Sequence, residues 1–196
     1  GVEVAVGVEP DDRRARGAAR LNAAGMGKRM FDLVGATIAL LLASPLMLLA
    51  ALAIKLDSPG PVFFRQQRVG RGGTLFEVHK FRTMVADAPA RGPALTVGDD
   101  ARITRVGRWL RHSKLDELPQ LFNVLKGDMS FIGPRPDVPE ITAKYTPEMK
   151  KIFAVRPGIT SVATLHFRQE EAILSKVPDP DRFYGEVVVP LKVELA

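Results

Sequence analysis

The run from Leu33 to Ile54 constrains this chain most, because it contains no charged residue. As one straight helix it would reach roughly 33 Å at about 1.5 Å per residue, which is enough for a hydrocarbon core of about 30 Å. A cleavable signal peptide is a poor interpretation, since the run is longer than the apolar region of a signal and no small-residue cleavage site ends it. We therefore expect the chain to be attached to a membrane.

The dipeptide Ser44-Pro45 lies at the middle of this run. Proline removes a backbone donor and clashes with the preceding turn, so we expect the helix to be broken there, at a membrane bend. Each half would be about 11 residues or roughly 16 Å long, which suits one leaflet. A re-entrant hairpin and an ordinary proline-kinked span are both open at this point. In the re-entrant form the freed backbone groups need partners, and the Ser44 hydroxyl is one candidate.

Basic residues lie on both sides of the apolar run: Lys28 and Arg29 before it, and Lys55, Arg65 and Arg68 after it. Such residues favour the cytoplasmic side, and a re-entrant hairpin keeps both flanks there. The formal charge of +6 fits anionic lipid headgroups, phosphorylated substrates or nucleic acid equally well. The chain has no cysteine, which excludes disulfides and argues against a structural zinc site.

The pattern divides the chain into three parts and predicts a mainly helical α+β fold. Residues 1–27 mix Gly, Ala and Arg without a lasting apolar period, and we expect a disordered leader. Residues 28–60 are the membrane helix-hairpin, and residues 61–196 are a small domain in the cytosol. Within that domain, residues 62–69 and 75–82 read as two strands joined by the glycine-rich stretch 70–74, which is a β-hairpin. Its interleaved Phe and Arg or Lys side chains also occur on nucleic-acid-binding surfaces.

The run from Arg111 to Pro136 is the most informative for chemistry. Pro119 fits the first turn of a helix and Gly127 a helix stop, so Asp116 and Glu117 are expected at or just before the helix start. An adjacent Asp-Glu pair can simply cap a helix, and that interpretation is open.

Two arginines accompany this acidic pair. Arg111 precedes it by about a turn, and Arg135 stands between two prolines, which is a rigid placement for a guanidinium that binds phosphate bidentately. The pattern therefore indicates a site with two carboxylates and several arginines for a phosphorylated substrate.

Several long motifs occur in a fixed order from about Lys28 onward: the apolar run broken at Ser-Pro, Lys80-Phe81-Arg82-Thr83-Met84, Leu115-Asp116-Glu117-Leu118-Pro119-Gln120, Gly127-Asp128-Met129-Ser130-Phe131-Ile132-Gly133-Pro134-Arg135-Pro136 and Arg156-Pro157-Gly158-Ile159-Thr160. In these motifs the chain resembles the bacterial sugar transferase family, the monotopic polyprenyl-phosphate phosphoglycosyl transferases. The resemblance implies that the membrane helix is re-entrant and that the domain is catalytic.

The resemblance also implies a reaction. Asp116 is expected to be the nucleophile that attacks the β-phosphorus of a UDP-sugar, releases UMP and holds the phosphosugar, which polyprenyl (undecaprenyl) phosphate then accepts. This step initiates synthesis of a surface glycan. Glu117 is the second carboxylate, and it either binds Mg²⁺ together with Asp116 or assists the acceptor. We favour binding of Mg²⁺. The cations implied to bind phosphate groups are Lys80, Arg111, Arg135 and Arg156.

The implied location is the bacterial inner membrane, with the catalytic domain on the cytoplasmic face and inner-membrane lipid as a partner. Residues 161–168 lack the Gly, Trp and Gln segment of many family members, so the sugar is undetermined. The chain also ends early for the family, and we expect a C-terminal truncation. Two other functions make different predictions: a membrane-anchored nucleic-acid-binding module would bind in a salt-dependent manner and survive Asp116→Asn, and a purely structural anchor would have no activity to lose.

Overall fold

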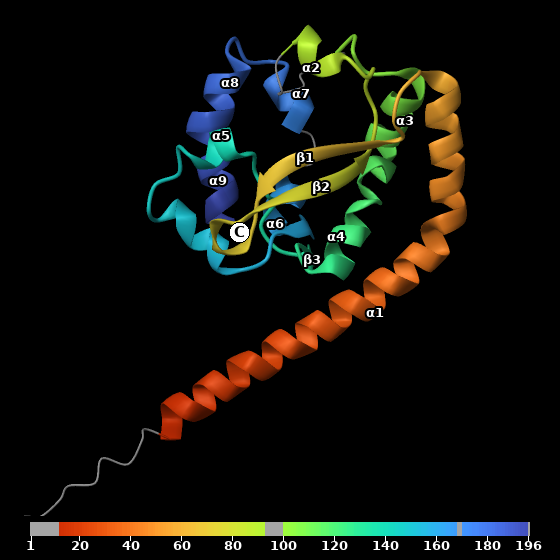
Figure 1. Cartoon of the computed structure of the whole chain (residues 1–196). Coiled ribbons are helices and arrows are strands. Elements are labelled where there is room, and N and C mark those ends of the chain that lie inside the picture. The colour runs from red at the N-terminus through yellow and green to blue at the C-terminus, as the bar shows by residue number, and fades with distance from the viewer. Residues whose placement is uncertain (1–11, 93–99, 168–169, 196) are drawn as a thin grey trace, which may run out of the picture.

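The computed structural model describes residues 12–92, 100–167 and 170–195. Its elements are α1 (Asp12–Asp57), β1 (Phe63–Val69), η1 (Arg71–Gly73), β2 (Leu75–Phe81), α2 (Ala88–Arg91), α3 (Arg105–Ser113), η2 (Leu115–Glu117), α4 (Gln120–Lys126), β3 (Ser130–Ile132), α5 (Pro139–Thr142), η3 (Met149–Ala154), β4 (Gly158–Thr160), α6 (Val162–His166), α7 (Glu170–Leu174), α8 (Pro180–Phe183), η4 (Tyr184–Val188) and α9 (Val189–Glu194). In Figure 1 the β1–β2 hairpin lies between α1, α3 and α4 on one side and α5, α8 and α9 on the other. This is the predicted mainly helical α+β fold.

The apolar run forms one helix, α1, which passes through Pro45 without ending. Figure 1 shows that this helix bends into two arms. Pro45 has no N–H to donate to the carbonyl of Leu41, and the Ser44 hydroxyl donates to that oxygen at 2.9 Å. The predicted bend is confirmed, but the helix does not end there, because the Ser44 side chain takes the place of the one missing main-chain bond. The expected role of the Ser44 hydroxyl is confirmed.

The start of α1 differs from expectation in part. The helix begins at Asp12, so residues 12–27 of the expected leader are helical, whereas residues 1–11 lie outside the described residues. Alanine and arginine are strong helix formers and predominate in this segment, which explains the extension of the helix.

Both arms of α1 pack on the same globular domain. The first arm contributes Ala36 to a buried cluster with residues of β2 and α4, and the second contributes Ala50 and Ile54 to a cluster with Phe81 and Leu110. The outer surface is apolar and exposed, with Leu42 at 79%. This one helix is long and apolar enough to cross a membrane, and only 17% of its most apolar window is buried among the described residues. That exposure distinguishes α1 from the core helix of a soluble domain.

The predicted β-hairpin is confirmed. β1 and β2 pair antiparallel, with Phe64 opposite Lys80 and Val69 opposite Leu75. The turn contains Gly72 and Gly73 at φ 68° and 77°, a left-handed conformation that favours glycine. Because residues directly opposite share a face, the pairing places Lys80 on the side of the hairpin that also carries Gln66 and Arg68.

A second, parallel strand pair joins two motifs that are distant in sequence. β3 pairs with β4, with Ser130 opposite Gly158 and Ile132 opposite Thr160. A Cβ atom on Gly158 would lie 2.2 Å from the main-chain nitrogen of Gly133, so no side chain fits at this crossing. The residues that follow β3 are held at this point.

The C-terminal part of the described chain is helical. Pro190 lies in the first turn of α9, which follows η4 directly, and the chain stays helical through it. A buried cluster of Tyr145, Leu174, Tyr184, Val188 and Val189 holds these helices together. They cover the segment that follows β3, which carries Arg135.

Candidate active site

The acidic pair lies in the short turn of helix η2, between α3 and α4, as predicted. The Thr104 side chain accepts a hydrogen bond from the Gly107 N–H and so caps the start of α3. Lys114, with φ 59°, ends α3 in the left-handed conformation and reverses the chain into η2. Gly127 ends α4 with φ 98°, as predicted from the sequence. The carboxylates are thus placed by a fixed helix–turn–helix geometry.

Glu117 is paired with two cations that come from different elements. Its Oε1 accepts from Lys80 Nζ of β2 at 3.0 Å and from Arg135 Nη2 at 2.6 Å, while Arg135 Nη1 reaches Oε2 at 3.3 Å. Burial alone would raise the pKa of Glu117, but Arg135 and Lys80 outweigh it and hold that pKa well below its usual range. Glu117 is therefore a fixed anion that holds both cations in place.

The two cations respond differently to this environment. Burial lowers the pKa of Lys80, and the neighbouring positive charge of Arg135 lowers it further. Burial acts in the same direction on Arg135, but the Glu117 carboxylate outweighs it and the pKa of Arg135 is raised. Arg135 is thus a permanent charge, and Lys80 is the titratable cation of the site.

Asp116 is buried, at 9% exposure, and its Oδ1 atom has no hydrogen-bond partner among the described residues. Burial raises the pKa of this carboxyl, partly opposed by the positive charge of Lys80. A desolvated carboxylate oxygen without a partner retains its lone pairs for a substrate or an ion. Asp116 therefore has the character of a reactive carboxylate, in contrast to the ion-paired Glu117.

The other two cations suggested by the sequence lie in different places. Arg111, in the last turn of α3, is close enough for its charge to act on the Asp116 carboxyl. Arg156 instead donates from Nε to the carbonyl of Gly127 at 2.9 Å, at the end of α4 opposite the acidic pair. The structure thus groups Lys80, Asp116, Glu117 and Arg135 with Arg111 nearby, and it uses Arg156 to close the end of α4.

Two further residues belong to this site but were missed from the sequence. Arg68 on β1 donates to the Pro136 carbonyl at 3.0 Å, and burial followed by the nearby charge of Arg135 lowers its pKa. Asn123, fully buried on α4, accepts from the His79 N–H at 3.0 Å and donates to the Glu77 carbonyl at 2.6 Å. Strand alternation was a usable signal for Arg68, since that residue shares a face with Lys80. No local signal indicated Asn123, whose partners are on another element.

A metal site made by the protein alone is absent from the described residues, which contain no group of three or more His, Cys, Asp or Glu side chains suited to one. Mg²⁺ usually takes one or two carboxylates and completes its shell with water and substrate phosphates. The unpartnered Asp116 oxygen fits that role. The Glu117 oxygens are already engaged by Lys80 and Arg135.

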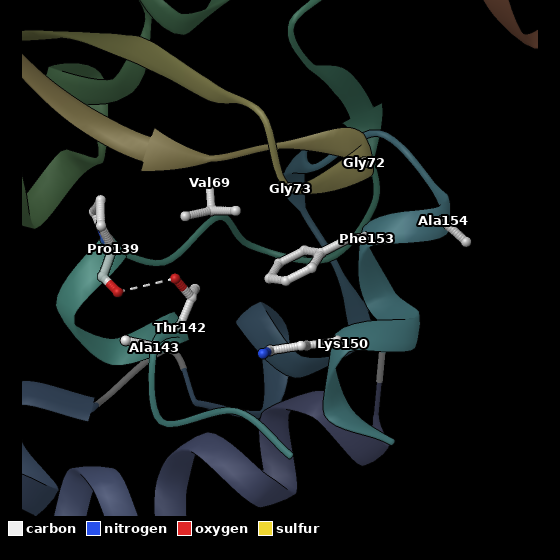
Figure 2. A pocket seen from close by; sticks show the side chains of 9 residues that line it. All are labelled: Val69, Gly72, Gly73, Pro139, Thr142, Ala143, Lys150, Phe153 and Ala154. Carbon is white, nitrogen blue, oxygen red and sulfur yellow. Dashed lines mark hydrogen bonds between the residues drawn. The ribbon is translucent and has the colours of Figure 1, made fainter. Parts of the chain in front are cut away.

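An open pocket of about 620 Å³ lies elsewhere, between the hairpin turn, α5 and η3. Figure 2 shows Phe153 and Lys150 on one side of it and Thr142 on the other, with the Thr142 hydroxyl bonded to the Pro139 carbonyl. None of the predicted site residues lines this pocket. The carboxylates and cations, and not the pocket, define the candidate active site.

An exposed apolar helix packs beside two carboxylates and several partly buried cations, and this combination indicates a membrane-associated protein. The sequence profile of the bacterial sugar transferase family matches residues 23–189. The chain belongs to that family, which confirms the resemblance seen in the motifs.

Individual relatives agree with this assignment. The chain is 49% identical over 139 residues to the UDP-glucose:undecaprenyl-phosphate glucose-1-phosphate transferase of Caulobacter vibrioides, covering 69% of this chain and 52% of that protein. It is 48% identical to the UDP-N-acetylgalactosamine-undecaprenyl-phosphate N-acetylgalactosaminephosphotransferase of Aeromonas hydrophila, over 69% of this chain and 33% of that one. A putative undecaprenyl-phosphate N-acetylgalactosaminyl 1-phosphate transferase of Bacillus subtilis is 46% identical, over 68% of this chain and 70% of that protein. The matched region thus spans about half of the first relative and a third of the second.

Proposed function

We propose that the chain transfers a sugar-1-phosphate from a UDP-sugar to undecaprenyl phosphate and so initiates synthesis of a surface glycan. The observation that carries this proposal is the buried Asp116 carboxylate, whose unpartnered oxygen lies beside the ion-paired cluster of Glu117, Lys80 and Arg135. The reactions named for the relatives are of this kind, with glucose or N-acetylgalactosamine as the sugar.

In the first step a carboxylate oxygen of Asp116 attacks the β-phosphorus of the donor. The bond between that phosphorus and the oxygen that bridges it to UMP breaks, and UMP leaves with the electron pair. Arg135 and Lys80 neutralise the diphosphate, and Arg111 adds charge beside Asp116. Glu117 keeps the two cations oriented for this contact. The product is an acyl phosphate between Asp116 and the sugar phosphate.

In the second step an oxygen of undecaprenyl phosphate attacks the same phosphorus. The bond from phosphorus to the Asp116 oxygen breaks, which restores the carboxylate and releases undecaprenyl-diphosphate-sugar. Asp116 would hold Mg²⁺ together with the donor diphosphate, because its Oδ1 atom lacks a partner. The bound ion supplies neutralisation of the diphosphate charge.

We also propose that α1 enters and leaves the membrane on one side. Its first arm is tied to the domain by Arg29, which donates to the carbonyls of Val124 at 2.6 Å and Leu125 at 2.8 Å. At its other end Asp57 accepts from the Val106 N–H at 3.0 Å. Because both ends contact the same domain, a re-entrant path accommodates these contacts and a full crossing does not. The basic flanks favour the cytoplasmic face.

This topology is testable because the chain has no cysteine of its own. The single substitutions Gly25→Cys and Pro61→Cys, at exposed positions on the two flanks of the apolar run, should both react from the cytoplasmic side of inner-membrane vesicles with a membrane-impermeant maleimide. Labelling of the two positions from opposite sides would show a span instead.

The reaction is tested by UMP release from a panel of UDP-sugars, with Mg²⁺ or with EDTA, and with or without undecaprenyl phosphate. Wild type should release UMP with the best donor, and the acceptor should allow repeated turnover. Asp116→Asn should lose this activity by at least about a thousandfold, because the nucleophile is gone. Asp87→Asn is the matched control, since Asp87 is an exposed carboxylate paired with Arg91. Absence of release by a folded, membrane-bound wild type, or full activity of Asp116→Asn, would contradict the proposed reaction.

A further inference from the structure

Arg135 lies in a short segment, residues 134–137, that is fixed from both sides. Three main-chain oxygens of this segment accept hydrogen bonds: Pro134 O from Gly158 N at 2.9 Å, Pro136 O from Arg68 Nη1 at 3.0 Å and Asp137 O from Val69 N at 3.0 Å. The backbone that carries Arg135 therefore has one tightly held path.

The side chain of Asp137 adds a contact that the proposed mechanism does not use. Its Oδ2 accepts from the Tyr145 hydroxyl at 2.7 Å and its Oδ1 from the Tyr184 hydroxyl at 3.3 Å. All three residues are at most 9% exposed. The chain has two tyrosines, and both donate to this one carboxylate.

The network continues into the C-terminal helices. Lys192 of α9 donates to the Tyr184 hydroxyl at 3.3 Å, and its ammonium lies 4.9 Å from the centre of the Tyr184 ring. The same ammonium forms an ion pair with Glu170 at the start of α7. A buried chain of polar contacts thus runs from Asp137, two residues after Arg135, to α7 and α9.

Stability alone does not explain such a network, because apolar side chains of similar volume often stabilise a core as much as buried charged groups or more. Its geometric effect is specific: two hydroxyls fix both oxygens of the carboxylate and hence the chain just after Arg135. Arg135 has to meet Glu117 with both of its terminal nitrogens, which tolerates little displacement.

We propose that Asp137 is a positioning residue for Arg135, and that through Tyr145 and Tyr184 it couples the C-terminal helices to the active site. This inference rests on the proposed function, because the reaction is what Arg135 is positioned for. The coupling predicts that loss of the Asp137 carboxylate disturbs catalysis only while Arg135 can make its bidentate contact.

The test is a double-mutant cycle in UMP release, made with the full chain in lipid nanodiscs. Asp137→Asn should lower kcat about tenfold and leave KM within about twofold, because a small displacement of a phosphate-binding group acts mainly on the chemical step. Arg135→Lys keeps the charge and loses the bidentate contact. In that background Asp137→Asn should cost no more than about twofold, because the positioned group is already absent. Asp87→Asn, in an exposed ion pair, is the matched control and should leave both backgrounds unchanged.

Tyr145→Phe covers the case in which Asp137→Asn fails to fold. It keeps the ring that stacks on Phe153 and removes only the hydroxyl, so it should show the same pattern with a smaller loss of kcat. A second readout needs no substrate: absorbance titration of the two tyrosines. Burial followed by the Asp137 charge raises the pKa of Tyr145, and the same two causes raise that of Tyr184, so Asp137→Asn should let both ionise at lower pH.

The outcomes separate the two proposals. Equal losses of kcat in the wild-type and Arg135→Lys backgrounds, or an unchanged tyrosine titration, would overturn the positioning role and leave the reaction standing. No UMP release by the wild type from any donor would overturn the reaction and the positioning role with it. If Asp137→Asn lowers kcat only in the background that contains Arg135, and the tyrosines then ionise at lower pH, the positioning role and the reaction are both supported.

Discussion

Asp116 and Glu117 are neighbours in the chain, yet their carboxylates lie in opposite electrostatic situations. Glu117 is held by Lys80 and Arg135, whereas the Oδ1 atom of Asp116 has no partner in the part of the chain that the structure describes. The pKa of Asp116 is raised, chiefly by burial, and that of Glu117 is lowered because its cations outweigh burial. One carboxylate is therefore kept reactive at a cost in stability, and the other stabilises the site.

This difference predicts opposite effects of two isosteric substitutions on stability. A raised pKa means that the ionised Asp116 destabilises the folded state above that pKa, so Asp116→Asn should raise the thermal midpoint at pH 7 while it abolishes activity. A lowered pKa means that Glu117 contributes stability at neutral pH that is lost as pH falls through its folded pKa. Glu117→Gln leaves two partly buried cations without their carboxylate and should cost about 2 kcal/mol. Thermal unfolding in detergent at pH 7 measures both effects, with Asp87→Asn as the exposed control; equal destabilisation by the two variants would contradict the assignment.

The pH dependence of activity should be bounded by Asp116 and Lys80. UMP release falls as pH drops through the raised pKa of Asp116, because the nucleophile becomes protonated, and it falls as pH rises through the lowered pKa of Lys80. Lys80→Arg keeps a positive charge that does not titrate, so it should remove the alkaline limb and leave the acid limb. The measurement is kcat/KM against pH for both proteins. An alkaline limb that persists in Lys80→Arg would assign it to another group.

The parts of the fold that depend on local contacts could be predicted from the sequence. The hairpin turn needs glycine where φ is positive, and α4 stops at Gly127 for the same reason. The bend of α1 could be predicted from Pro45, but the continuation of the helix through Pro45 could not. Proline marks a local perturbation, but whether the helix ends there depends on what replaces the missing bond, which here is the Ser44 hydroxyl.

The parts that depend on distant contacts could not be predicted in this way. The motifs named Lys80, Asp116, Glu117 and Arg135 but not how they pair. They also did not indicate that the Nε of Arg156 donates to the Gly127 carbonyl at the end of α4. The parallel pairing of β3 with β4 brings together residues almost thirty positions apart, and no local pattern reports such a register. Asn123 and Asp137 were missed for the same reason, since their partners lie on other elements.

Asn123 should be one of the most sensitive positions outside the charged cluster. Its amide joins α4, which follows the acidic pair, to the β2 backbone beside Lys80. Asn123→Ala leaves the His79 N–H and the Glu77 carbonyl without these partly buried hydrogen bonds and should lower the free energy of unfolding by about 2 kcal/mol. Gln67→Ala, which removes an exposed amide on β1, should change it by less than about 0.5 kcal/mol. Denaturant unfolding in detergent compares the two; similar small effects would mean that the Asn123 contacts are not made in solution.

Gly158 tests whether the two motifs cross as closely as the structure shows. A Cβ atom there would lie 2.2 Å from the nitrogen and 2.6 Å from the oxygen of Gly133, and both are backbone atoms that cannot move aside without separating β3 from β4. Gly158→Ala should therefore cost about 3 kcal/mol, at the upper end for overpacking, and should lower activity because Arg135 follows directly after this crossing. Gly185→Ala meets nothing within 4 Å and is the matched control, expected to be neutral or slightly stabilising because alanine favours helix. Thermal unfolding and UMP release are measured for the two variants. Equal stability and activity of the two would show that the strands are further apart. A loss of stability and activity confined to Gly158→Ala supports the close contact of the two backbones that holds Arg135 in the site.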